Sequence, residues 1–99
     1  MRRGSTPQHI FTLSLDAAAI DKVRVLYAQN GKLLFRKEGD QVTIDGQKVI
    51  VELTQEDTLQ FRQGTAEVQL RVNTPGGKSI PSQIYSIPVE RLLENEVFT

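Results

Sequence analysis

The chain has 99 residues, of which 12 are basic, 12 are acidic and none is cysteine. This length suffices for one domain with one hydrophobic core. A net charge of zero provides no long-range attraction to nucleic acid or to an anionic membrane. The lack of cysteine excludes disulfide frameworks and thiolate metal sites. We therefore expect a single domain over residues 1–99.

The two ends of the chain differ from the part between them. Two arginines open the sequence, but no apolar stretch of the length found in signal peptides follows them. No apolar run approaches the ~20 residues that a membrane-spanning helix needs. We expect a protein that is made and folded in the cytoplasm, with a short N-terminal arm (1–8) and a C-terminal tail (92–99).

Apolar and polar residues alternate through most of the chain, which is typical of β-strands with one buried face. Seven segments share this pattern: 9–15, 22–29, 32–38, 41–44, 48–53, 65–73 and 83–91. The most regular segment is 65–73, and the core residues that we predict around it are Val68, Leu70 and Val72, with Val25 and Val51. Seven short strands with regular turns predict an all-β fold, an antiparallel β-sandwich of the Ig-like or jelly-roll-like kind.

Turn residues separate the predicted strands. Asn30-Gly31 lies between two apolar runs and predicts a type I′ hairpin, because both central residues of that turn take positive φ. Asp45-Gly46 predicts a second hairpin, and 74–77 predicts a further loop. In the strand between the first two turns, we expect Leu33 and Phe35 to face the core together.

The segment 54–61 departs from the alternation. Thr54 precedes two acidic residues, and a threonine side chain caps free N–H groups at the start of a helical turn, where acidic residues are also favourable. We predict one helical turn that closes an end of the sandwich, with Leu59 and Phe61 beneath it. A second candidate turn is 16–21.

The sequence offers little for catalysis or for metal binding. His9 is the only histidine, and we interpret it as an ordinary strand residue. Glu56 and Asp57 are adjacent, so they point in different directions and suit capping better than metal coordination. The segment 75–79 lacks the spacing of a phosphate-binding loop. We predict no enzymatic activity, no catalytic residue, no cofactor and no metal.

Two features near the C-terminus indicate a protein-binding surface. Pro88 lies within the last predicted strand, and because proline cannot donate to a ladder we expect an edge strand or a bulge there. Beyond it, the acidic tail carries four apolar side chains: Leu92, Leu93, Val97 and Phe98. The i, i+4 spacing of Leu93 and Val97 predicts one apolar helical edge. The alternative is that these four side chains fold back on the core of the same chain.

An ordered set of short motifs runs through nearly the whole chain. It comprises Arg2-Arg3-Gly4-Ser5-Thr6-Pro7, Phe11-Thr12-Leu13, Tyr27-Ala28-Gln29, Leu53-Thr54-Gln55-Glu56-Asp57-Thr58 and Val68-Gln69-Leu70-Arg71-Val72. With this set, the chain resembles small proteins encoded in phages and prophages of gut Firmicutes. Their organisation is similar to the N-terminal sandwich domain of phage baseplate upper proteins, which attaches receptor-binding machinery to the tail. Relatives often carry cysteines where this chain has none.

The resemblance implies a tail or baseplate component that acts by protein–protein binding, made in the bacterial cytoplasm and carried in the virion. Its expected partners are other copies of itself or other tail proteins, and not nucleic acid, membrane or a small-molecule substrate. The alternative is a non-structural phage-encoded module that binds and regulates a host protein. We expect the tail and an open sheet edge to form the binding surface.

Overall fold

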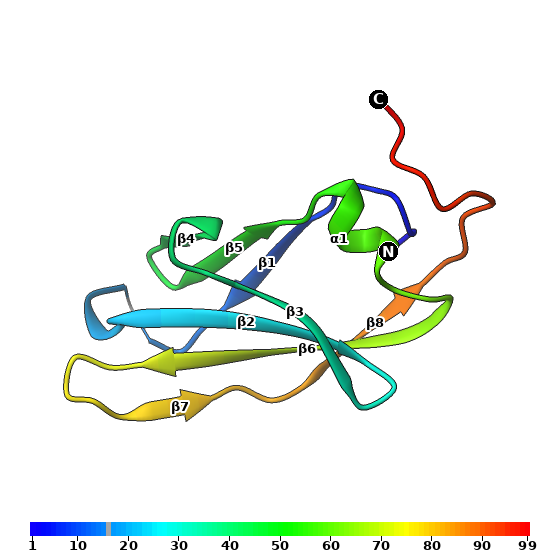
Figure 1. Cartoon of the computed structure of the whole chain (residues 1–99). Helices are drawn as coiled ribbons and strands as arrows, with labels where there is room; N and C mark the ends of the chain where they lie inside the picture. Colours follow the sequence, from blue (N-terminus) through cyan, green and yellow to red (C-terminus); the bar gives the residue numbers. More distant parts are fainter. Residues whose placement is uncertain (16) are drawn as a thin grey trace.

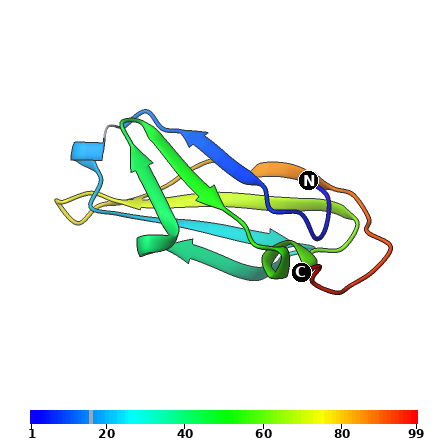
Figure 2. The ribbon, with the colours of Figure 1, turned by 90° about the horizontal axis from the view of Figure 1, so that it is seen from above.

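Two antiparallel sheets face each other in the computed structural model, which describes residues 1–15 and 17–99 (Figure 1, Figure 2). Within these residues, one sheet has the strand order β1-β5-β4, and the other has the order β3-β2-β6, with β7 and β8 both pairing with β6. The strands are β1 (Gln8–Thr12), β2 (Lys22–Gln29), β3 (Lys32–Glu38), β4 (Val42–Asp45), β5 (Lys48–Glu52), β6 (Gly64–Asn73), β7 (Ser79–Pro81) and β8 (Tyr85–Val89). The predicted all-β antiparallel sandwich is confirmed.

The core lies between the sheets and consists of the inward residues of alternating strands. Val25, Val51 and Leu70 are fully buried, as predicted for the pattern of period two. The other buried apolar side chains are Val23, Tyr27, Val49, Leu53, Phe61, Ala66, Val68, Val72 and Val89. Phe11, Tyr85 and Ile87 cover this core from the edge strands β1 and β8.

Three short helical segments connect strands in the part of the chain that the structure describes. They are the 3₁₀ turns η1 (Ala17–Ala19) and η2 (Gly39–Gln41) and the helix α1 (Gln55–Leu59). Thr54 caps α1 as predicted, because its side chain accepts a hydrogen bond from the backbone N–H of Asp57. The fully buried ring of Phe61 follows α1. The second predicted turn coincides with η1, although its first residue, Asp16, lies outside the described part of the chain.

The two predicted hairpins form, but one of them is displaced by a residue. Asn30 and Gly31 both take positive φ, 54° and 76°, as a type I′ turn requires. In the second hairpin β4 extends to Asp45, so the central residues are Gly46 and Gln47 instead of the predicted pair. Gly46 has φ 60° at the first central position, where a type II′ turn needs glycine.

A β-bulge in β3 overturns the prediction that Leu33 faces the core. The pairing passes from Tyr27 with Phe35 to Ala28 with Leu33, so that Leu34 is an extra residue in β3. Phe35 remains inward and stacks on Tyr27, with ring centroids 4.9 Å apart. Beyond the bulge the alternation changes face, so Leu33 is 52% exposed and Leu34 packs against the core instead.

The edge beside β6 was only partly anticipated from the sequence. β7 was not predicted, because its three residues are all exposed and lack an apolar face. It pairs with the end of β6 after the predicted loop at 74–77. Pro88 lies opposite Thr65 in β8. In the described residues β8 pairs with no strand other than β6, so Pro88 lies in an edge strand as predicted. The edge is not open at Pro88, however, because the amino group of Met1 donates to the carbonyl of Pro88 over 2.7 Å.

One buried polar side chain joins the sheet to the loop after α1. Gln29, at the end of β2, is 5% exposed. Its Oε1 accepts a hydrogen bond from the backbone N–H of Arg62, and its Nε2 donates one to the carbonyl of Arg62, each over 2.7 Å. Both polar atoms of this amide are therefore paired, as a buried amide requires.

Candidate protein-binding surface

The two ends of the chain meet at one end of the sandwich (Figure 1, Figure 2). Arg2 forms a parallel bridge with Glu90, just after β8. The backbone N–H of Arg3 donates to the carbonyl of Glu90, and the N–H of Glu90 donates to the carbonyl of Met1. The N-terminal arm is therefore joined to the strand that leads into the tail.

Arg3 fastens the same arm to α1. Its Nε donates to the carbonyl of Phe61, and an Nη donates to the carbonyl of Leu59 over 3.1 Å. The last carbonyls of a helix lack partners within it, and a cationic donor there satisfies them. The N-terminal arm is therefore bound both to the end of β8 and to the end of α1, at the same end of the sandwich as the tail.

An ion pair with little solvent exposure holds the start of α1 against β3. Nζ of Lys37 lies 2.7 Å from Oδ2 of Asp57, and the two side chains are only 11% and 13% exposed. The same carboxylate accepts a hydrogen bond from the backbone N–H of Thr54, which completes a capping box. Burial alone would raise the pKa of Asp57, but the hydrogen bonds from Lys37 and Thr54 and the lysine charge outweigh it, so the pKa lies below its ordinary value.

The tail begins with a residue that packs on the arm. Leu92 is partly buried, and its Cδ2 would lie only 2.6 Å from a Cβ placed on Gly4. Gly4 also has φ 80°, a conformation that favours glycine. Any side chain at Gly4 would clash with Leu92, so the packing of Leu92 on the arm requires glycine at this position.

Further along, the tail returns to α1. Oε1 of Gln55 accepts a hydrogen bond from the backbone N–H of Phe98, and Nε2 of Gln55 donates one to the carbonyl of Phe98, each over 2.8 Å. Val97 lines the hollow beside α1. The side-chain amide of Gln55 thus pairs with both backbone groups of Phe98, as a residue of a neighbouring β-strand would.

Beyond Leu92 the tail exposes apolar side chains. Leu93 is 90% exposed, Phe98 is 78% exposed, and Val97 is also exposed. We call Leu93, Val97 and Phe98 the tail surface. Exposed apolar side chains that lie together on a surface mark sites where another protein docks, so the tail surface is a candidate for such a site.

The structure separates the predicted interface residues. Leu92 packs on the arm, and Leu93 and Phe98 are open to solvent. Pro88 lies on a sheet edge that the N-terminus of the same chain covers. The predicted helical edge through Leu93 and Val97 is wrong, since residues 92–99 form no helix. A helix of so few residues is marginal in water, and the bonds to Gln55 hold the backbone in another conformation.

The only histidine forms a partly buried pair with a tyrosine. Nδ1 of His9 lies 2.7 Å from the hydroxyl of Tyr27, whose side chain is fully buried. Burial, and then the charge of the N-terminus, lower the pKa of His9. Burial, and then the carboxylate of Asp57, raise the pKa of Tyr27. The tyrosine ring is enclosed, whereas the imidazole of His9 is partly buried and lines a shallow surface hollow with Phe11 and Tyr85.

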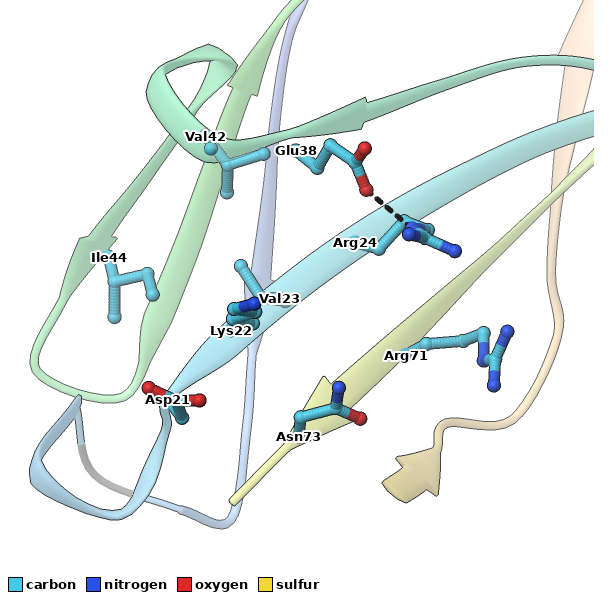
Figure 3. A pocket seen from close by; sticks show the side chains of 10 residues that line it. Asp21, Lys22, Val23, Arg24, Glu38, Val42, Ile44, Arg71 and Asn73 are labelled. Carbon is cyan, nitrogen blue, oxygen red and sulfur yellow. Dashed lines mark hydrogen bonds and ion pairs between the residues drawn. The ribbon is translucent and has the colours of Figure 1, made fainter. Parts of the chain in front are cut away.

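A groove of about 490 Å³ opens at the other end of the sandwich, between β2 and β4 (Figure 3). Val23, Val42 and Ile44 form its apolar part. Its charged and polar lining consists of Asp21, Lys22, Arg24, Glu38, Arg71 and Asn73. The sequence does not reveal this groove, because only the pairing of the strands brings these side chains together.

Within the groove, Arg24 and Glu38 form an ion pair (Figure 3). The hydrogen bond from Arg24 is the main reason why the pKa of Glu38 lies below its ordinary value. In the described ranges, 1–15 and 17–99, no three histidine or acidic side chains lie close enough to hold a metal ion. Among the same residues no helix is long and apolar enough to cross a membrane.

Comparisons with protein-family models, with curated proteins and with solved structures give no match for this chain.

Proposed function

We propose that this protein binds other protein chains through its tail surface, and that it does so as a component of a phage or prophage tail or baseplate. The observation that carries the proposal is the exposure of Leu93 and Phe98 on a segment whose backbone is held by Gln55. A fold that needed the tail only for its own stability would turn these two side chains inward.

The attachment of the tail reduces the cost of binding. A disordered segment loses conformational entropy when it docks, whereas a segment that is already held in place loses less. Fully burying a leucine or a phenylalanine contributes about 1.5–3 kcal/mol each before the costs of association are subtracted. Leu93 and Phe98 together are therefore sufficient for a contact that matters at high local concentration.

The resemblance to phage and prophage proteins supplies the proposed setting. A tail or baseplate is built from many copies held close together, so modest contacts suffice to order them. Catalysis is not part of the proposal. The one histidine is engaged with a buried tyrosine, and the exposed features of the chain are apolar anchors and sheet edges.

Deletion of residues 93–99 tests the binding role. Leu92 stays in this variant, because it covers Gly4. We expect light scattering to show association of the full chain that the truncated chain lacks, while both unfold at nearly the same temperature. Association that survives the deletion would contradict the role of the tail surface, and loss of folding would assign the tail to the core.

The phage setting needs a separate test. Mass spectrometry of particles purified from an induced lysogen that encodes this chain should detect it in stoichiometric amount relative to tail proteins. Its presence in the infected cell but absence from the particles would favour the alternative, a non-structural binding module.

A further inference from the structure

We propose that the groove between β2 and β4 binds the acidic tail of a second copy of this chain, so that copies associate head to tail. The inference rests on the proposed function, since it names the surface that receives the tail. Three observations support it: the charges around the groove, the complementary side chains of the tail, and the positions of groove and tail at opposite ends of the molecule.

The groove has an apolar floor at an incomplete strand edge. β3 pairs with β2 only as far as Glu38 with Arg24, so the start of β2 has no strand beside it on that side among the described residues. Leu70 bonds to Ser82 on the far side of β6, so its partner Val25 turns its backbone groups towards β3. Because backbone groups alternate along a strand, those of Val23 face the open side. Such an edge accepts an extended segment of another chain.

The rim of the groove carries more cationic side chains than the ion pairs there neutralise. Arg24 and Arg71 lie directly opposite each other in the pairing of β2 with β6, an arrangement of like charges that is destabilising. Glu38 pairs with Arg24, but no carboxylate in the described part of the chain forms an ion pair with Lys22 or Arg71. A bound carboxylate would relieve this repulsion.

The tail has the complementary chemistry. Residues 92–99 carry two acidic side chains, Glu94 and Glu96, and no basic one. In an extended backbone, side chains two and four positions apart share a face, so Leu93 and Val97 point the same way. These two apolar side chains match the floor formed by Val23, Val42 and Ile44, while the glutamates match Lys22 and Arg71.

The groove and the tail lie at opposite ends of a molecule that measures 46 Å along its longest axis (Figure 1, Figure 2). The occupant of the groove is therefore the tail of another copy and not that of the same chain. A contact between two different surfaces produces a ring if the rotation closes and a filament if it does not. Each copy in such an assembly uses its own tail and receives that of its neighbour.

Charge-reversed full-length chains test this contact by sedimentation velocity, at concentrations up to about millimolar. The groove variant is Lys22→Glu/Arg71→Glu, and the tail variant is Glu94→Lys/Glu96→Lys. The control is Arg62→Glu/Lys78→Glu, which makes the same change of charge as the groove variant but on exposed loops outside groove and tail. Thermal unfolding of each variant verifies that it is folded.

We expect each of the two test variants to lose self-association by about tenfold or more, and the control to lose little. Mixed in equal amounts, the two test variants should regain it, because each reversed tail then meets a reversed groove and each natural tail a natural groove. Raising the salt concentration should weaken the association of the full chain. If either reversed chain fails to fold, Lys22→Gln/Arg71→Gln and Glu94→Gln/Glu96→Gln should still weaken association.

Three results would overturn the inference. The first is a full chain that stays monomeric over this range, and the second is a mixture that associates no better than its components. The third is association that is lost on deletion of 93–99 but unaffected by reversal of the groove. This third result would leave the proposed binding role of the tail surface standing and move its receptor elsewhere.

Discussion

Two glutamines make the same contact in two different regions of the molecule. Gln29 and Gln55 each accept a hydrogen bond from a backbone N–H and donate one to the carbonyl of the same residue, over 2.7 Å and 2.8 Å. Gln29 holds Arg62 in the buried end of the sheet, whereas Gln55 holds Phe98 at the surface. The bonds are alike, and the surroundings differ.

This difference separates stability from binding. Because Gln29 is 5% exposed, the loss of either bond leaves a polar atom of its buried amide without a partner, so this contact contributes to the stability of the fold. Around Gln55 water replaces a lost bond at little cost, so the contact orders the tail without contributing much to folding. The tail is thus held in one place while Leu93 and Phe98 stay exposed, as the proposed binding of another chain requires.

The largest expected contrast is between two leucines. Leu70→Ala should lower the free energy of unfolding by about 2–5 kcal/mol, because it deletes fully buried methyl groups and leaves a cavity. Leu93→Ala makes the same chemical change on a side chain that is 90% exposed, and it should stay within about 0.5 kcal/mol of the unchanged chain. Urea titration measures both, and similar losses would refute the division into core and tail.

The two glutamines give the next contrast. Gln29→Ala should cost about 1–3 kcal/mol, because it removes a buried side chain and both of its hydrogen bonds to the partly buried backbone of Arg62. Gln55→Ala should cost no more than about 0.5 kcal/mol. Thermal unfolding compares them, and a cost for Gln55→Ala equal to that for Gln29→Ala would mean that the tail belongs to the cooperative fold.

The hairpin after β2 provides a third test, in which we expect a change of about 1–2 kcal/mol in the free energy of unfolding. Gly31→Val should be destabilising by this amount, because Gly31 has φ 76° and a β-branched residue resists that conformation. Gly76→Val is the control, since Gly76 has no positive φ and lies in an exposed loop. If the two variants were equally stable in urea, the positive φ of Gly31 would not be what makes glycine necessary in this turn.

The smallest effect on stability concerns pH. Because the pKa of His9 is lowered in the fold, the unfolded chain binds the proton more readily, and stability should decrease as the pH falls below the ordinary histidine value of 6.5. His9→Gln has no proton to bind there, so its unfolding temperature should change less between pH 7 and pH 5. Identical pH profiles for the two chains would contradict this role of His9.

Much of the fold follows from local patterns in the sequence, and the exceptions have physical causes. The bounds of β2 and β3, the turn at Asn30-Gly31 and the cap at Thr54 depend on neighbouring residues alone. The bulge at Leu34 depends on how two strands pair, so alternation alone gave the wrong face for Leu33. β7 has no buried side chain and therefore left no apolar pattern to detect.

The candidate surface was predictable in part. Composition was enough to single out the apolar side chains of the tail, because they stand in an acidic segment beyond the last strand. Their conformation depends on Gly4 and Gln55, which lie far away in the sequence. The cations of the groove depend on the register that sets Arg24 opposite Arg71, which no local pattern encodes.

The most direct test of the central claim removes the exposed anchors and nothing else. The test variant is Leu93→Ala/Phe98→Ala. The control is Leu33→Ala/Ile84→Ala, which removes two other exposed apolar side chains, 52% and 56% exposed, from outside the tail. Sedimentation velocity and thermal unfolding are measured on both and on the unchanged chain. We predict that all three unfold at nearly the same temperature and that only the test variant loses association. Equal association of the test variant and the control would contradict the claim that the tail surface binds other chains.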